Sequence, residues 1–191
     1  MISNISKIIL ASNSPRRQEL LKGLDMPFTV HVLQDIDETY PADMDCKNVP
    51  EYLARKKALA YDALIDAETL VITADTLVIL ENKVYGKPKD EDEAKQMLHN
   101  LSGKTHEVIT GVCLYSKNKV KTFSSNSEVR FAKLDDADIN YYVKRYKPLD
   151  KAGAYGIQEW IGYIGIEYIA GSYFNIMGLP VQKLSRELKE F

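Results

Sequence analysis

The stretch Lys7-Ile-Ile-Leu-Ala-Ser-Asn-Ser-Pro-Arg-Arg17 decides the fold at the start of the chain. Its first part, residues 7–12, is a short apolar run of the kind that forms a buried strand. Ser14 is a good helix N-cap and Pro15 suits the first helical position, so we expect a helix that continues to Leu24. A strand, a tight turn and a helix in this order are typical of an α/β protein.

The rest of the chain mixes strand and helix patterns without a strict alternation. Apolar or alternating runs predict strands over residues 28–33, 69–74 with a continuation at 77–80, 84–85, 105–115, 122–131, 162–169 and 172–176. Helical patterns span residues 49–65, with Asn48 as the expected cap, and residues 90–101, 135–146 and 180–188. Because no linker, repeat or low-complexity tract interrupts them, we predict one domain over residues 1–191 with a mixed sheet.

The composition argues against several classes of protein. Of 191 residues 45% are hydrophobic and 27% charged, and the net charge of −2 lacks the basic excess of a broad nucleic-acid binder. No apolar run approaches the ~20 residues that span a bilayer, and residues 1–7 lack the apolar part of a signal peptide. We therefore expect an intracellular protein with no nucleic-acid or membrane partner. Cys46 and Cys113 are expected to be free thiols.

Residues 12–17 have the features of an anion-binding turn. A strand-to-helix turn presents unpaired backbone N–H groups and the positive end of the helix dipole. Ser12 and Ser14 add hydroxyl groups, while Arg16 and Arg17 add planar cations that suit phosphate oxygens. The alternative is a capped surface helix whose arginines lie in water, and this segment alone leaves both interpretations open.

Asp75 interrupts the otherwise apolar stretch of residues 70–80. A carboxylate in such a position is costly unless it faces a cleft, pairs with a cation or binds a metal. A structural aspartate that closes the strand and bonds a turn would explain it equally well. The adjacent acids Asp37 and Glu38 could hold Mg²⁺ or Mn²⁺, or could belong to a solvated acidic loop.

Two lysines could complete a phosphate site, although lone lysines are usually solvated. Lys87 follows the predicted hairpin, and Lys57 lies on the alanine-rich helix. Lys56 is about 100° round that helix from Lys57, so at most one of the two readily faces a cleft.

Several other motifs are excluded. Ser102-Gly-Lys-Thr105 is not a Walker A motif, because Leu98 stands where that motif requires a glycine. The three histidines show no metal-ligand spacing. No GxSxG sequence occurs, which argues against a Ser-His-Asp hydrolase.

Taken together, the segments resemble the Maf family of nucleotide pyrophosphatases, and they occur in the family's order over nearly the whole chain. The matching segments are Ser12-Asn-Ser-Pro-Arg-Arg17 with Glu19-Leu-Leu21, Ala74-Asp-Thr76, Lys87-Pro88, Leu101-Ser-Gly-Lys-Thr-His106, Asp150-Lys-Ala-Gly-Ala-Tyr-Gly-Ile-Gln158, Gly171-Ser-Tyr173 and Gly178-Leu-Pro180. The resemblance implies an elongated α/β fold with a mixed central sheet flanked by helices. It also implies two lobes around a cleft, similar to inosine triphosphate pyrophosphatases.

The resemblance also implies a reaction and roles for the site residues. Cleavage would fall between the α and β phosphates and release a monophosphate and pyrophosphate. By this likeness Asp75 is the proton acceptor for the attacking water, and Glu38 joins Asp75 near a divalent cation, Mg²⁺ or Mn²⁺. The residues that would line the triphosphate are Ser12, Arg16, Arg17, Lys57 and Lys87.

Arg16, Thr76 and Gln158 match the trio of the family branch that acts on dTTP and UTP. The substrate could equally be a modified pyrimidine nucleotide such as pseudo-UTP or 5-methyl-UTP. The likeness further suggests a cytoplasmic homodimer, with a role in nucleotide-pool sanitation or in cell division. An alternative of another class is a non-catalytic nucleotide-binding regulator of division, although a pure binder would not need a buried carboxylate that faces bound phosphate.

Overall fold

Seven strands form one mixed sheet within residues 5–191, the part of the chain that the computed structural model describes. The strands are β1 (Lys7–Leu10), β2 (Thr29–Val30), β3 (Thr69–Leu80), β4 (Lys83–Tyr85), β5 (Thr105–Ser116), β6 (Lys119–Phe131) and β7 (Ile166–Ala170). They lie in the order β2-β1-β3-β5-β6-β7, with β4 beside β3. β1 is parallel to β2 and β3, whereas the pairs β3–β4 and β6–β7 are antiparallel.

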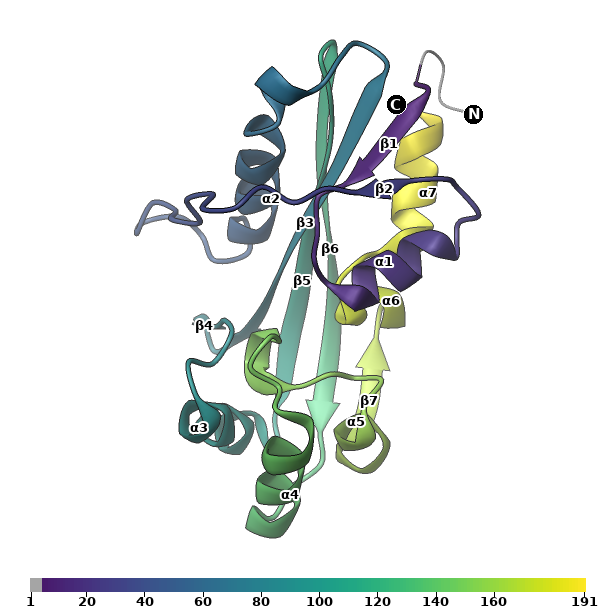
Figure 1. Ribbon diagram of the computed structural model, residues 1–191. Helices are drawn as coiled ribbons and strands as arrows, with labels where there is room; N and C mark the ends of the chain where they lie inside the picture. Colours follow the sequence, from purple (N-terminus) through teal and green to yellow (C-terminus); the bar gives the residue numbers. More distant parts are fainter. Residues whose placement is uncertain (1–4) are drawn as a thin grey trace. The chain divides into compact units, whose positions relative to one another are not determined.

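Helices connect these strands and flank the sheet (Figure 1). They are α1 (Pro15–Lys22), α2 (Val49–Leu59), α3 (Glu91–Leu101), α4 (Asp136–Tyr146), α5 (Trp160–Gly165), α6 (Tyr173–Met177) and α7 (Val181–Lys189), with 3₁₀ turns η1 (Asp62–Leu64) and η2 (Ala152–Ala154). The prediction of an α/β fold with a mixed central sheet is confirmed.

The chain divides into two compact units. The first contains the described part of Met1–Asp75, together with Thr110–Ser125 and Gly178–Phe191, and the second contains Thr76–Ile109 and Asn126–Met177. The long strands β3, β5 and β6 have residues in both units. The prediction of a single domain over residues 1–191 stays a prediction.

The first unit packs helix α2 against one side of its strands and α7 against the other (Figure 1). Its apolar core includes Ile9, Ala54, Ala58, Tyr61, Ile65, Val71, Cys113 and Tyr115. Helix α2 approaches β5 closely at Gly111, where an added Cβ would lie 2.2 Å from the backbone nitrogen of Glu51. Only a glycine therefore permits this approach of helix to strand.

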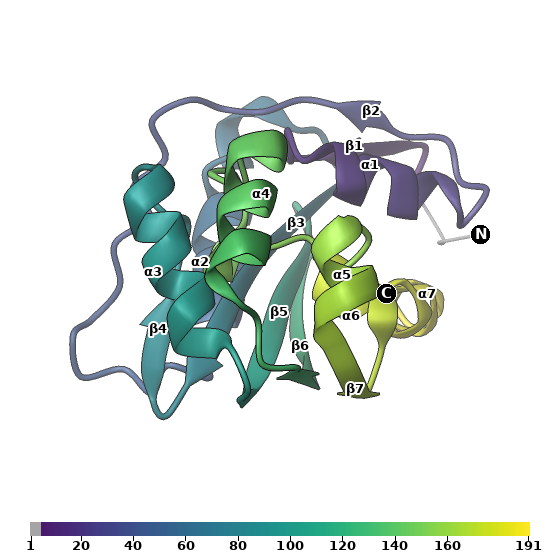
Figure 2. The same cartoon turned by 90° about the horizontal axis from the view of Figure 1, so that it is seen from below.

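In the second unit, helices α3 and α4 lie side by side (Figure 2). The core beneath them includes Val78, Leu98, Leu101, Val108, Phe131, Ile139, Tyr142 and Tyr155. Both helices begin at an aspartate that accepts a backbone hydrogen bond: Asp90 from Glu93 N at 2.8 Å and Asp135 from Asp138 N at 2.8 Å. These caps fix where the two helices start.

Helix α2 begins at Val49 as predicted, but it lacks the expected cap and is shorter than predicted. Asn48 precedes it, but its side chain makes no capping hydrogen bond. The helix ends at Leu59 instead of continuing to residue 65. Tyr61 explains this end, because its buried hydroxyl donates to His31 O at 2.8 Å and accepts from Leu33 N at 3.0 Å. These bonds to another segment favour a tight turn over a further helical turn.

Two predicted strands near the C-terminus are wrong in part. Residues 162–165 belong to helix α5, and only Ile166–Ala170 form a strand. Residues 172–176 were expected to be a strand but form the helical turn α6, Tyr173–Met177. Gly171, with φ 109°, ends β7, and the Ser172 hydroxyl then accepts from Asn175 N at 3.3 Å. This local cap prevails over the strand preference of the aromatic and β-branched residues.

The strand predicted over residues 28–33 pairs only at Thr29–Val30. Its partner β1 ends at Leu10, whose carbonyl accepts from His31 N at 3.3 Å, so no further β1 residue is available for pairing.

Three further expectations concern the chain as a whole. Cys46 and Cys113 are free thiols, as predicted. No helix within residues 5–191 is long and apolar enough to cross a membrane. Residues 1–4, part of the segment in which the sequence shows no signal peptide, lie outside the described residues.

Candidate active site

The turn between β1 and α1 has the local structure that its sequence predicts. The Ser14 hydroxyl caps α1 by accepting from Arg17 N at 3.5 Å, and Pro15 occupies the first turn. Ser12 is buried, and its hydroxyl oxygen accepts from Ser14 N at 3.2 Å. Because Ser12 acts as an acceptor in this bond, its own hydroxyl proton stays available to donate to an anion at the helix N-terminus.

Asp75 lies in β3, near the middle of the strand, and pairs with a cation from α2. Lys57 Nζ is 2.6 Å from Asp75 Oδ1, and both side chains are largely buried. Glu38, in the loop after β2, places its Oε1 3.2 Å from the same ammonium group. The carboxylate that interrupts the apolar strand is therefore compensated by a lysine, and two carboxylates converge on one cation.

The neighbouring residues Asp37 and Lys56 form a separate pair outside this centre. Lys56 Nζ lies 2.7 Å from Asp37 Oδ2 and also donates to Thr39 O at 2.9 Å. Hydrogen bonds from Lys56 and then from Thr39 lower the pKa of Asp37 to about 2. The prediction that only one of the two lysines faces the site therefore agrees with the structure: Lys57 contacts Asp75, while Lys56 holds the acidic loop.

Arg17 turns inward from α1. Its Nε donates to Gly178 O at 2.8 Å and its Nη1 donates to Ala74 O at 2.8 Å. Burial lowers the pKa of Arg17, and the nearby Asp75 carboxylate opposes this effect by raising it. Arg16, next to it in the first turn of α1, is only partly buried. Ser12, Arg17, Glu38, Lys57 and Asp75 thus belong to connected segments of the first unit.

The other predicted site residues lie in the second unit. Thr76 follows Asp75 directly in β3, and Lys87 is an exposed residue just after β4. Gln158 lies between η2 and α5, and its Oε1 is buried with no hydrogen-bond partner among the described residues. A buried acceptor of this kind is costly when it stays unpaired, which is consistent with a group that bonds a ligand.

The segment that carries Gln158 is held by buried polar groups that the sequence analysis did not identify. Lys151 Nζ lies between Asp150 Oδ1 at 2.7 Å and Glu159 Oε1 at 3.1 Å. The Tyr142 hydroxyl donates to Glu159 and accepts from Gly156 N at 3.0 Å. The one available signal was a lysine within a run of glycine and alanine, where a charged residue must find partners if the segment is buried.

His106 was also missed as a structural residue. It is buried, its Nε2 lies 2.8 Å from the Tyr155 hydroxyl, and its ring stacks on Phe131. Burial lowers the pKa of His106 to about 4, so the imidazole is neutral at pH 7. A neutral ring in contact with the rings of Phe131 and Tyr155 supports the packing of the second unit.

The carboxylates of Glu38 and Asp75, which both approach Lys57, fit a divalent cation whose other ligands are waters or substrate phosphates. Within residues 5–191 no three histidine, cysteine, aspartate or glutamate side chains are grouped as a metal site. Mg²⁺ commonly takes only one or two protein carboxylates, and waters or substrate phosphates complete its octahedron. The hard oxygens of Glu38 and Asp75, which already approach one cation, match that donor set.

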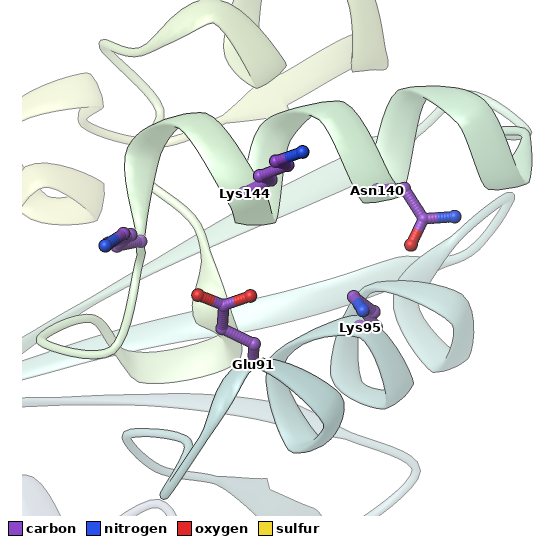
Figure 3. A pocket seen from close by; sticks show the side chains of 5 residues that line it. Glu91, Lys95, Asn140 and Lys144 are labelled. Carbon is purple, nitrogen blue, oxygen red and sulfur yellow. The ribbon is translucent and has the colours of Figure 1, made fainter.

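A surface hollow in the second unit contains none of the predicted residues. Figure 3 shows Glu91 and Lys95 on α3 opposite Asn140 and Lys144 on α4, and Lys147 completes the lining. All five lining side chains are polar and four of them are charged, so the hollow does not have the lining of apolar side chains that is usual for a small-molecule site.

Comparison with known proteins gives a consistent result over the full chain. Residues 7–191 match the family described as Maf-like protein. Proteins named dTTP/UTP pyrophosphatase are similar to this chain in Parabacteroides distasonis (57% identity, 100% of both chains) and Phocaeicola vulgatus (56%, 100% of both). A third, from Flavobacterium psychrophilum, is 52% identical over 94% of this chain and 91% of its own length.

Two solved structures share the fold at low sequence identity. The Staphylococcus aureus Ham1 protein has a TM-score of 0.56 and 17% identity, covering 95% of this chain and all of its own. A HAM1 protein from Coxiella burnetii has a TM-score of 0.51 and 17% identity, covering 97% of this chain and 99% of its own. These two structures show that the fold of this chain also occurs in proteins of low sequence identity, and they agree with the predicted α/β fold with a mixed central sheet.

Proposed function

This chain belongs to the Maf family, and we propose that it hydrolyses dTTP and UTP to the nucleoside monophosphate and pyrophosphate. Relatives that match it over their whole length carry the name dTTP/UTP pyrophosphatase. The observation that carries the proposal is the pairing of Lys57 with Asp75, the one charged residue of strand β3. A buried carboxylate kept beside a lysine and a second carboxylate is suited to acid–base work at a phosphate.

Asp75 is the proposed proton acceptor. A water molecule beside the α phosphorus would give its proton to the Asp75 carboxylate as it forms the new P–O bond. Pyrophosphate would leave as the bond to the α phosphorus breaks. Lys57 supports this step because its ammonium, 2.6 Å from Asp75, compensates the carboxylate charge and fixes its orientation.

Glu38 and Asp75 are the proposed residues for a divalent cation, Mg²⁺ or Mn²⁺. When bound, such a cation supplies positive charge that stabilises the phosphate oxygens. Lys57 now lies between the two carboxylates, so its ammonium would share them with the cation.

Cations and helix dipoles are proposed to hold the triphosphate. Ser12 offers its hydroxyl proton at the start of α1, and Arg16 lies in the first turn of the same helix. Lys57 and Lys87 add ammonium groups, and Arg17, the fifth predicted ligand, contributes its charge while it donates to two backbone carbonyls. Such fixed donors stabilise the negative charge that develops on the leaving pyrophosphate.

Arg16, Thr76 and Gln158 are the proposed base-selecting residues. The buried Oε1 of Gln158 lacks a partner among the described residues and could accept from N3–H of uracil or thymine. Cytosine has no hydrogen at N3, so it would leave this acceptor unpaired in the complex. Discrimination of this kind can be strong, since unpaired buried groups are costly.

A nucleotide panel tests the proposal. The purified chain is incubated with Mg²⁺ or Mn²⁺ and with dTTP, UTP, CTP, ATP, GTP, pseudo-UTP or 5-methyl-UTP, and released pyrophosphate is measured. We expect fastest release from the uracil and thymine nucleotides and none without the metal. Nucleotide binding without pyrophosphate release would instead favour the non-catalytic regulator.

The cellular setting completes the proposal. We propose a cytoplasmic homodimer that removes unwanted pyrimidine triphosphates or links their level to division. Support comes from the family resemblance, and size-exclusion chromatography with light scattering would test the dimer.

A further inference from the structure

Arg17 joins three segments that are far apart in the sequence. From α1, it donates to Ala74 O in β3 and to Gly178 O in the segment before α7, each at 2.8 Å. These hydrogen bonds have normal lengths and use two different nitrogens of one planar guanidinium group. All three segments belong to the first unit.

The hydrogen bond from Arg17 to Ala74 O lies where the ladder between β1 and β3 would continue if β1 were longer. β1 runs parallel to β3 and ends at Leu10. The next residue, Ala11, still donates its backbone N–H to Ile72 O at 2.9 Å. In a parallel ladder the next acceptor on this edge is two residues further, at Ala74. β1 ends at Leu10, and the chain has turned toward α1, which begins at Pro15, before it reaches the level of that carbonyl. Arg17 Nη1 donates to the Ala74 carbonyl from this helix.

The carbonyl that Arg17 binds belongs to the peptide group between Ala74 and Asp75. A peptide group is planar, so fixing its oxygen also fixes the direction in which the chain enters Asp75. Lys57 holds the other end of the same residue, at the carboxylate. Asp75 is thus held at two points, by a lysine at its side chain and by an arginine at its backbone.

We propose that Arg17 is a positioning residue, which orients Asp75 by holding the Ala74 carbonyl and the Gly178 carbonyl together. This inference rests on the proposed function, in which Asp75 accepts the proton. Lysine cannot replace arginine here, because its single ammonium lacks the planar fork that reaches two carbonyls in fixed directions.

Kinetics distinguishes positioning from phosphate binding. For Arg17→Lys, which keeps the positive charge but loses the planar fork, we expect kcat on dTTP to fall about 100-fold, the effect of a misplacement of about 1 Å, while KM changes by less than about threefold. Lys22→Gln, on the exposed last turn of α1, is the matched control and should keep both constants. An Arg17→Lys variant with wild-type kcat, or one in which only KM rises, would overturn the proposal.

A second measurement does not depend on activity. Hydrogen exchange followed by mass spectrometry should show faster exchange in peptides covering residues 69–80 of Arg17→Lys, and no change there in Lys22→Gln. Unchanged exchange in Arg17→Lys would also overturn the positioning role. If the wild-type chain releases no pyrophosphate from any nucleotide, the proposed function fails, and the exchange data still decide whether Arg17 holds β3.

Discussion

Lys57 Nζ lies 2.6 Å from Asp75 Oδ1, although the lysine comes from helix α2 and the aspartate from strand β3. The pair is largely buried, so each charge depends on the other for the interactions that water would otherwise supply. This relationship explains how an apolar strand can contain a carboxylate. It also allows the roles of Lys57 and Lys56 to be distinguished by experiment.

Removal of the Lys57 charge should affect both stability and activity. Lys57→Met leaves Asp75 without its ammonium partner, and we expect the free energy of unfolding to fall by about 2–4 kcal/mol, somewhat below a fully buried pair. Urea denaturation measures this change. Lys56→Met is the control, because its pair with Asp37 is exposed to solvent and its loss should change the free energy of unfolding much less. Equal losses in the two variants would contradict this account.

Gln158 should determine which pyrimidine is accepted. Gln158→Met removes the buried acceptor with little change in volume, so the preference for UTP over CTP in kcat/KM should fall by about tenfold or more. Thermal unfolding should change little, since the removed oxygen has no partner in the described part of the chain. An unchanged UTP to CTP ratio would show that other groups select the base.

His106 should make stability depend on pH. Burial lowers its pKa from the ordinary 6.5 to about 4, so between these values the unfolded chain binds a proton that the folded chain does not. Stability is therefore complete above about pH 6.5 and is lost as the pH falls toward 4, with a decrease of about 2 kcal/mol from pH 7 to pH 5. Urea unfolding at both pH values measures it. His106→Gln should remove most of this difference. If the variant lost as much stability between pH 7 and pH 5 as the wild type does, His106 would not be the cause of the pH dependence.

Gly111 should be intolerant of any side chain. In Gly111→Ala the new Cβ would meet the backbone of Pro50 and Glu51 at 2.2–2.4 Å, so helix α2 would have to move away from β5. We expect a loss of more than about 3 kcal/mol, at the upper end of overpacking effects. Gly86→Ala is the control, because nothing lies within 4 Å of its added Cβ. Similar unfolding midpoints for the two variants would contradict the packing argument.

Local signals in the sequence were sufficient for part of this structure. Ser14 and Pro15 predicted the start of α1, and the interruption of an apolar run identified Asp75. Long-range partners could not be predicted in this way, since the bond from Arg17 to Gly178 joins residues 161 positions apart. The strand predicted over residues 172–176 failed because a serine cap outweighed residue preferences.

The most direct test of the central claim is pyrophosphate release from dTTP by Asp75→Asn, compared with the wild-type chain under the same Mg²⁺ concentration. We predict that kcat falls about 100-fold or more, because an amide cannot accept the proton of the attacking water. Asp25→Asn makes the same chemical change at an exposed position with φ 53°, which asparagine tolerates, and it should keep wild-type activity. Equal pyrophosphate release from Asp75→Asn and the wild type would contradict the assignment of Asp75 as the proton acceptor.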